Sequence, residues 1–413
     1  MLFLGIFTML FLWGLIYLVT KDLLSPASIS GIVWFLVYII LFITSGDRIF
    51  KDENYCIFAL AYALFAIGFL ISYPKKSINN HISYRMEWNT DFRRGLCIIN
   101  YVAAFSWVLA SYQYIITGSG GIWASVREAV GELDSLQSGI AGIMQNVVIM
   151  YFIVSYAFFL TNKTVNNKKN LIISIPPLLM VMLLSSRGIW YFLIISVVMI
   201  GMLIHNTSNM KVIKIGVLGI IGFLIIFIVS SFQKYEEAFS SYSMTDKLLT
   251  VFKSYFSTPP VAFVQWMETN TQYYHGAYIF RFIFAILSKL GMNVEVVDTV
   301  QPFVYVDGVA TNVYTALHWY ASDYGIISIV FVELILGFLF GKLYKKARCT
   351  RTPSIFVIVL YSMLIFTIVI QFFYEQFFSI MSIWIQRFIL LFLFTKTKLS
   401  KSGDKGNEYQ ENI

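Results

Sequence analysis

The stretch "MLLSSRGIWYFL", from Met182 to Leu193, decides the class of fold. It lies inside an apolar run from Leu171 to His205 that is interrupted by one arginine, Arg187. A helix needs about 20 residues to cross the roughly 30 Å hydrocarbon core of a bilayer. The run is too long for one crossing and just long enough for two short ones, so the chain must turn near Ser185–Gly188, where the glycine suits a tight turn. Arg187 would then lie at a membrane edge.

The whole chain shares this apolar character. Of its 413 residues, 58% are hydrophobic and 13% are charged, whereas about a quarter of the residues of a soluble protein are charged. The apolar runs are continuous and do not alternate as the strands of a membrane barrel do. We therefore predict an all-α polytopic membrane protein with about eleven transmembrane helices. The candidate spans are residues 2–20, 29–45, 55–73, 95–117, 139–161, 171–185, 188–206, 212–232, 324–343, 354–373 and 377–395.

Basic residues at the ends of the spans predict the orientation, because cytoplasmic loops carry an excess of lysine and arginine. With eleven spans and an extracytoplasmic N-terminus, the basic segments all fall on the cytoplasmic side. These segments are residues 74–94, 162–170, 344–353 and the tail after residue 395. Arg187 then lies at the outer membrane edge.

Residues 1–399 are expected to form a single integral membrane domain, followed by a polar, disordered cytoplasmic tail over residues 400–413. Within the domain, the segment of about residues 233–323 forms a large extracytoplasmic loop. This loop is rich in aromatic residues and has amphipathic stretches, so we expect it to contain short helices. Long ordered loops in compact proteins are usually functional.

Three arginines on the outer face are candidates for binding an anion: Arg187, Arg281 and Arg127. The first two lie in apolar surroundings, and a guanidinium binds phosphate through a planar, bidentate fork. The alternative for both is an interfacial anchor whose charged end reaches water. Arg127 lies on a short amphipathic stretch with several acidic residues, where a solvated surface helix is the alternative.

The stretch "YYHGAYIFRFIF", from Tyr273 to Phe284, carries the second of these arginines. If it is helical, Tyr274, Tyr278 and Arg281 share one face. The two tyrosines are therefore candidates for substrate binding.

Polar residues also precede the ninth span, in "TNVYTALHWYASDYG" from Thr311 to Gly325. On a helix, Thr311, Thr315, His318 and Ser322 form one stripe, and Asp323 follows at the membrane edge. His318 or Asp323 could accept a proton as a general base. The alternative is that these residues cap and solvate the first turns of the span.

Several motifs of soluble enzymes are absent, among them DxD, HExxH, the Walker loop and GxSxG. The three cysteines lie far apart and form no CxxC pair. We therefore expect no metal and no cofactor, and the basic span ends do not indicate a nucleic-acid partner.

Two stretches together resemble the bacterial oligosaccharide repeat-unit polymerases, that is, the Wzy-type O-antigen and capsular polysaccharide polymerases. The stretches are "LLSSRGIWYFLIISVVM" and "TNVYTALHWYASDYGIISIVFVELILGFLFGKLYKK". Their shared features are an arginine-glycine pair at a hairpin, and an Asn-Val-Tyr-Thr segment followed by Asp-Tyr-Gly. In the second stretch, Asn312 and Thr315 are candidates for binding substrate.

The resemblance implies a multi-pass glycosyltransferase of the bacterial inner membrane that acts on glycans linked to undecaprenyl diphosphate. It also implies an architecture like that of membrane glycosyltransferases of the C type, and partners such as a flippase and a chain-length regulator. The arginines would bind the departing diphosphate, where charge develops in the transition state. Alternatives are an O-antigen ligase, or a flippase or another transporter, which should place charges at mid-membrane. Only Glu333 and Arg387 fall well inside predicted spans.

Overall fold

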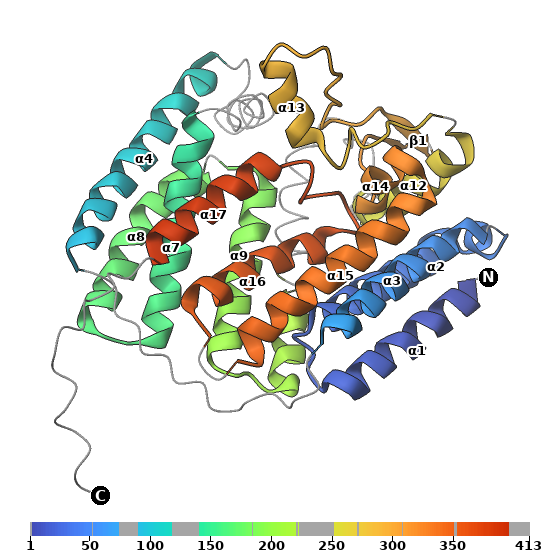
Figure 1. Ribbon diagram of the computed structural model, residues 1–413, viewed down its shortest axis with the longest axis horizontal. Coiled ribbons are helices and arrows are strands. Elements are labelled where there is room, and N and C mark those ends of the chain that lie inside the picture. The colour runs from blue at the N-terminus through green and yellow to red at the C-terminus, as the bar shows by residue number, and fades with distance from the viewer. Residues whose placement is uncertain are drawn as a thin grey trace, which may run out of the picture. The chain divides into compact units, whose positions relative to one another are not determined.

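The computed structural model is almost entirely helical (Figure 1). It describes residues 2–51, 53–73, 90–117, 140–183, 185–219, 222, 252–270, 272–307, 309–350 and 353–395. Helices cover every predicted apolar span except the eighth, of which residues 212–219 and 222 are described and helical.

The apolar helices are α1 (Leu2–Thr20), α2 (Pro26–Lys51), α3 (Ile57–Ser72), α4 (Thr90–Thr117), α7 (Ile140–Thr161), α8 (Val165–Leu183), α9 (Arg187–Ile204), α15 (Ile326–Arg348), α16 (Ile355–Ile370) and α17 (Met381–Thr395). A 3-10 turn, η1 (Glu53–Cys56), precedes α3. Among the described residues, four helical stretches are long and apolar enough to cross a membrane, and five apolar helices are shorter. The helices are therefore those of a membrane protein with several spans.

The predicted extracytoplasmic loop does contain short helices, namely α12 (Thr258–Thr269), α13 (Arg281–Lys289) and α14 (Ala316–Tyr324). It also contains a feature that the all-α prediction missed. Strands β1 (Val304–Val306) and β2 (Val309–Thr311) pair as a small antiparallel hairpin.

The chain divides into two compact units. One unit comprises Met1–Ser83 and Arg187–Ile385, and the other comprises Tyr84–Ser186 and Gln386–Ile413. The first unit therefore holds α12 to α16, which include the polar residues singled out in the sequence. The single membrane domain over residues 1–399 stays a prediction.

The smaller unit packs α4, α7 and α8 against one another. A polar contact joins α7 to α17: Asn146 donates to Gln386 (Nδ2 to Oε1, 2.9 Å) and accepts from Arg387 (Nε to Oδ1, 3.0 Å). Arg387, which the sequence places inside a span, is thus buried and hydrogen-bonded. This satisfies the general need of a charge inside a membrane protein for a polar partner.

The break predicted in the run from Leu171 to His205 is confirmed, because α8 ends at Leu183 and α9 begins at Arg187. The predicted role of Gly188 in the turn is wrong, since this glycine lies inside α9. Ser185 forms the bend instead: its N–H donates to the Met182 carbonyl, and its Oγ accepts from Gln145.

Helices α3 and α15 make the closest helix contact of the larger unit, and three glycines allow it. A Cβ on Gly68 would overlap the carbonyl oxygen of Leu334, and a Cβ on Gly337 would overlap that of Phe65. Gly341, one turn further along α15, faces Phe69 and Ser72 of α3 in the same way. Small residues let helix backbones approach this closely in membrane proteins.

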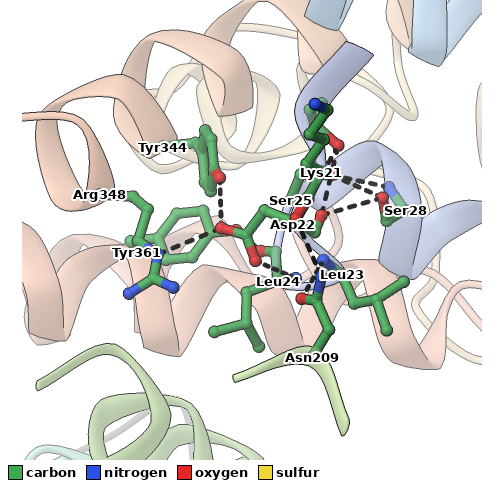
Figure 2. Close-up of polar contacts among 11 residues, drawn as sticks. Lys21, Asp22, Leu23, Leu24, Ser25, Ser28, Asn209, Tyr344, Arg348 and Tyr361 are labelled. Carbon is green, nitrogen blue, oxygen red and sulfur yellow. Dashed lines mark hydrogen bonds and ion pairs between the residues drawn. The ribbon is translucent and has the colours of Figure 1, made fainter. Parts of the chain in front are cut away.

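The C-terminal end of α15 is held by a buried carboxylate in the loop between α1 and α2 (Figure 2). Asp22 accepts from the Tyr344 hydroxyl (2.6 Å) and forms an ion pair with Arg348 (Nε to Oδ2, 3.1 Å). Its other oxygen accepts the Leu24 N–H (3.0 Å), and the Leu24 carbonyl accepts from Tyr361 of α16 (2.6 Å). Removing one partner of such a buried pair costs about 3–5 kcal/mol, because a charge is left uncompensated.

The helix that begins at residue 209 joins the same loop. The Asn209 side chain accepts the Leu23 N–H (3.2 Å) and donates to the Lys21 carbonyl (2.9 Å). One short loop therefore connects α1, α2, α15, α16 and this helix within the larger unit (Figure 2).

Gly337→Ala should lower the thermal unfolding temperature of the purified protein. The added methyl group would meet backbone atoms of α3, which cannot rotate away, and overpacking of this kind costs about 1–3 kcal/mol. Gly14→Ala in α1 is the control, because nothing lies within 4 Å of the position of its Cβ. Equal unfolding temperatures for both variants would contradict the close contact.

Candidate functional site

The polar residues that precede α15 lie on a short buried helix, α14. Thr315 is its N-cap residue, and His318, Ser322 and Asp323 follow on it. All four are buried, so they do not solvate the first turns of a span. The predicted stripe is wrong at Thr311, which pairs with Val304 in the β1–β2 hairpin and lies before the helix starts.

Gly325 separates α14 from α15 and allows the chain to change direction. Its φ is 65°, a left-handed value that side chains with a Cβ disfavour. A Cβ here would also lie 3.2 Å from the hydroxyl of Tyr273. Gly325, between the two helices, is therefore packed directly against Tyr273, which shortly precedes the turns of residues 275–280.

Asp323 ties that turn to α14. Its carboxylate accepts the backbone N–H groups of Tyr278 (3.0 Å) and Ile279 (2.9 Å), and its own carbonyl accepts the His275 N–H (3.2 Å). Burial raises the pKa of Asp323, while these N–H groups and the nearby His275 act in the opposite direction. Both carboxylate oxygens accept hydrogen bonds from backbone N–H groups, so Asp323 has the geometry of a residue that positions the turn.

The condition under which Tyr274, Tyr278 and Arg281 would share one helix face is not met, because residues 275–280 form turns and α13 begins at Arg281. His275 and Gly276 adopt φ values of 49° and 97°, which an α-helix does not allow. The physical reason is the distant carboxylate of Asp323, which binds N–H groups that a helix would use internally.

The two tyrosines nevertheless meet, with ring centroids 5.1 Å apart in an edge-to-face arrangement. Tyr278 is buried and donates its hydroxyl to Gln301 (3.2 Å), while Tyr274 is exposed. Burial raises the pKa of Tyr278 to about 12, so it remains protonated and a donor. Tyr274 is therefore the one of the pair that is accessible from outside the protein.

His318 lies among aromatic rings from three separate segments. Tyr314 stacks on it at 4.2 Å, Trp266 of α12 meets it edge-on at 4.5 Å, and Tyr278 lies at 6.4 Å (centroid distances). Burial lowers the pKa of His318 to about 3. The imidazole is therefore neutral at physiological pH and has a lone pair that can accept a proton.

Arg281 begins α13 and is half-buried. Its Nε–H donates to the Val297 carbonyl (2.7 Å), which orients the plane of the guanidinium. Burial lowers the pKa of Arg281 and the nearby Asp298 opposes this, but an arginine keeps its charge. A guanidinium whose Nε is used in this way can bind an anion bidentately through its two Nη atoms.

The remaining predicted site residues differ in their burial and in whether the structure describes their side chains. Asn312 is half-buried and Thr315 is buried, and among the described residues the Thr315 hydroxyl has no hydrogen-bond partner. The backbone of Arg187 begins α9, while its side chain lies outside the described part of the structure. Arg127 also lies outside the described residues.

Sequence reasoning missed two residues around His318. Tyr314 precedes it by four positions, so helical spacing could have indicated the contact. Trp266 belongs to a different helix, so no sequence spacing relates it to His318. The two rings meet only because the tertiary fold brings α12 and α14 together.

A further missed residue is Glu375, in the loop between α16 and α17. It is buried and accepts the N–H groups of Phe377 (2.6 Å), Phe378 (2.8 Å) and Ser379 (2.7 Å). Burial raises its pKa, and these N–H groups oppose the rise. Phe378 packs edge-on against Tyr320 at 5.9 Å, so this ordered loop supports α14.

Among the residues that the structure describes, no three His, Cys, Asp or Glu side chains gather as metal ligands. Metal-independent chemistry stays a prediction.

The chain is 23% identical over 398 residues to "Putative O-antigen polymerase" of Escherichia coli (strain K12), an alignment that covers 91% of this chain and 93% of that protein. The chain resembles the O-antigen polymerases. The resemblance predicted from the two motifs is thereby confirmed. No protein-family model matches the chain, and no solved structure matches it.

Asp323→Ala should destabilise the protein. It leaves the buried N–H groups of Tyr278 and Ile279 without an acceptor, at a cost of about 1–3 kcal/mol for each such group. Thermal unfolding in detergent measures the loss. Asp323→Asn keeps one acceptor oxygen, so its unfolding temperature should lie between those of the wild type and Asp323→Ala. An unchanged unfolding temperature for Asp323→Ala would refute the positioning role.

His318 should make stability depend on pH in a stated direction. The pKa of His318 is about 3 in the folded protein and 6.5 in the unfolded chain. The contribution of the neutral imidazole to the free energy of unfolding is therefore complete above pH 6.5 and is lost as the pH falls towards 3. At pH 5 the free energy of unfolding is lower by about 2 kcal/mol than at neutral pH. Unfolding temperatures measured from pH 7.5 to 4.5 should fall more steeply for the wild type than for His318→Phe, and parallel curves would contradict the buried, neutral imidazole.

Proposed function

We propose that this chain polymerises lipid-linked oligosaccharide repeat units into O-antigen or capsular polysaccharide. The growing glycan leaves its undecaprenyl diphosphate carrier and is transferred to a terminal sugar hydroxyl of an incoming lipid-linked unit, on the outer face of the inner membrane. The observation that carries the proposal is the similarity to an O-antigen polymerase over nine tenths of both chains. The polar site around α14 supports it.

The orientation with eleven spans, an outer N-terminus and a cytoplasmic C-terminus belongs to the same proposal. Two contacts between distant residues support the part of this proposal that places particular loops on the same side of the membrane. Asp22, in the first loop, pairs with Arg348 at the end of α15, as expected if both lie on the cytoplasmic side. Asn54, in the second loop, donates to Glu268 of α12 (3.3 Å), as expected if both lie on the outer side.

The roles that we propose follow the chemistry of each side chain. Arg281 binds the departing diphosphate, with Arg187 and Arg127 as further cations. His318 accepts the proton of the attacking hydroxyl, and the arriving diphosphate favours this step because a nearby negative charge raises the pKa of an imidazole. Asp323 positions the turn that leads to Arg281. Tyr274, Tyr278, Asn312 and Thr315 bind the sugars.

Neither a nucleotide nor a metal is required in this scheme, because the lipid diphosphate is already an activated leaving group. The overall architecture would be like that of membrane glycosyltransferases of the C type. A flippase would supply the substrate, and a chain-length regulator would set the length of the product.

The glycan ladder of a strain that lacks the chain tests this function. A missing polymerase leaves glycan capped at one repeat unit, a missing ligase leaves polymer unattached to its acceptor, and a missing flippase leaves intermediates facing the cytoplasm. Complementation with the wild-type chain should restore the ladder.

Complementation with Arg281→Ala should not restore it, since losing one donor to a developing anion often costs on the order of 10²–10³ in rate. Lys253→Ala is the matched control, because this exposed cation lies in the same outer segment. A normal ladder from Arg281→Ala at wild-type protein levels would remove the diphosphate role.

A further inference from the structure

Helix α13 is apolar yet unburied. None of its residues is buried in the protein. Ile283, Ile286 and the C-cap residue Leu290 repeat at intervals of three and four, which places them on one side of the helix. They are 49%, 42% and 74% exposed. A contiguous apolar face of this kind is costly in water and marks a surface that something covers.

Two other exposed apolar side chains extend this face beyond the helix. Phe280 precedes α13 and is 52% exposed, and Met292 follows it and is also 52% exposed. Gly291, with a φ of 88°, ends the helix and turns the chain so that Met292 follows closely.

The position of α13 indicates what covers the face. The carboxylate of Asp323 holds the N–H groups of Tyr278 and Ile279, which directly precede α13. Asp323 itself is three residues from the start of α15, one of the helices long and apolar enough to cross a membrane. Ile326 and Ile327, in the first turn of α15, are also exposed. The apolar face of α13 is thus tethered beside the outer end of a span.

The polar residues of α13 agree with a membrane surface. Arg281 is at its first position and Lys289 is at its last, and Ser288 lies opposite the apolar face by helical spacing. A short helix with an apolar face and basic residues lies in the interface, with that face about 5–10 Å into the boundary between headgroups and acyl chains. The basic residues suit the anionic phosphates of the headgroups.

We infer that α13 lies flat in the outer leaflet, with Ile283, Ile286 and Leu290 among the acyl chains. Arg281 is then at the depth of the lipid phosphates, and a lipid-linked diphosphate reaches it laterally, without leaving the bilayer. The choice of the outer leaflet and this last clause rest on the proposed function, whereas the membrane contact does not.

The test measures depth in the membrane and does not depend on activity. The three native cysteines, Cys56, Cys97 and Cys349, are replaced in the full-length chain, and a nitroxide spin label is attached at Ile286→Cys, Leu290→Cys or Ser288→Cys. The protein is placed in nanodiscs of zwitterionic and anionic phospholipid. Power-saturation EPR then compares the accessibility of each label to oxygen, which concentrates in lipid, and to a water-soluble nickel chelate.

We expect the labels at positions 286 and 290 to favour oxygen and the label at position 288 to favour nickel, with a several-fold difference in the accessibility ratio. Nickel accessibility that is equally high at all three positions would overturn the inference, since α13 would then lie in water. Low accessibility to both reagents at positions 286 and 290 would also overturn it, since protein would then cover the face. A lipid-exposed α13 together with a normal glycan ladder for Arg281→Ala would uphold the membrane contact and remove only the diphosphate role.

Discussion

The backbone contact between α3 and α15 is the constraint on which the larger unit depends. Gly68 and Gly337 bring main-chain atoms of the two helices together, so their separation cannot change without breaking the contact. This fixes the axis of α15, and each end of that helix then carries a polar cluster. At its C-terminal end, Asp22 joins Arg348 and Tyr344. Before its N-terminal end, Asp323 organises the turn that leads to α13.

The two buried carboxylates solve the same physical problem in different ways. A charge removed from water needs partners that replace its hydration. Asp22 binds the guanidinium of Arg348 and the hydroxyl of Tyr344, and it thereby holds the loop between α1 and α2 to α15. Asp323 accepts the backbone N–H groups of Tyr278 and Ile279, and it thereby stabilises the turn that contains them. Neither is arranged as a free base. Burial keeps His318 neutral and lowers its pKa, so the proposed role as proton acceptor depends on the negative charge of the arriving diphosphate, which raises the pKa of an imidazole.

In the proposed function the site lies at a membrane edge, and this position is consistent with the proposed chemistry. A diphosphate on a lipid anchor stays at headgroup depth, so a cation that binds it must lie at the same level. A half-buried guanidinium oriented by the Val297 carbonyl meets this requirement without a long flexible loop. The aromatic rings around His318 exclude water, which strengthens any electrostatic interaction made there.

The sequence by itself determined where the helices lie, because crossing a bilayer needs a fixed length of apolar residues and hydropathy is a local property. It also singled out His318, Asp323 and Arg281 as candidate site residues, because polar groups beside an apolar run are conspicuous. It failed at Tyr274–Phe280, where helical spacing predicted a helix and residues 275–280 form turns.

Only the tertiary structure shows which groups surround these residues. Asp323 became a positioning residue because N–H groups some 45 positions away in the chain bind it, and Trp266 joined His318 from another helix. The close approach of Gly68 to α15 likewise pairs segments that are remote in the chain. Hydrogen-bond partners and backbone contacts are non-local, so a pattern read along the chain does not contain them.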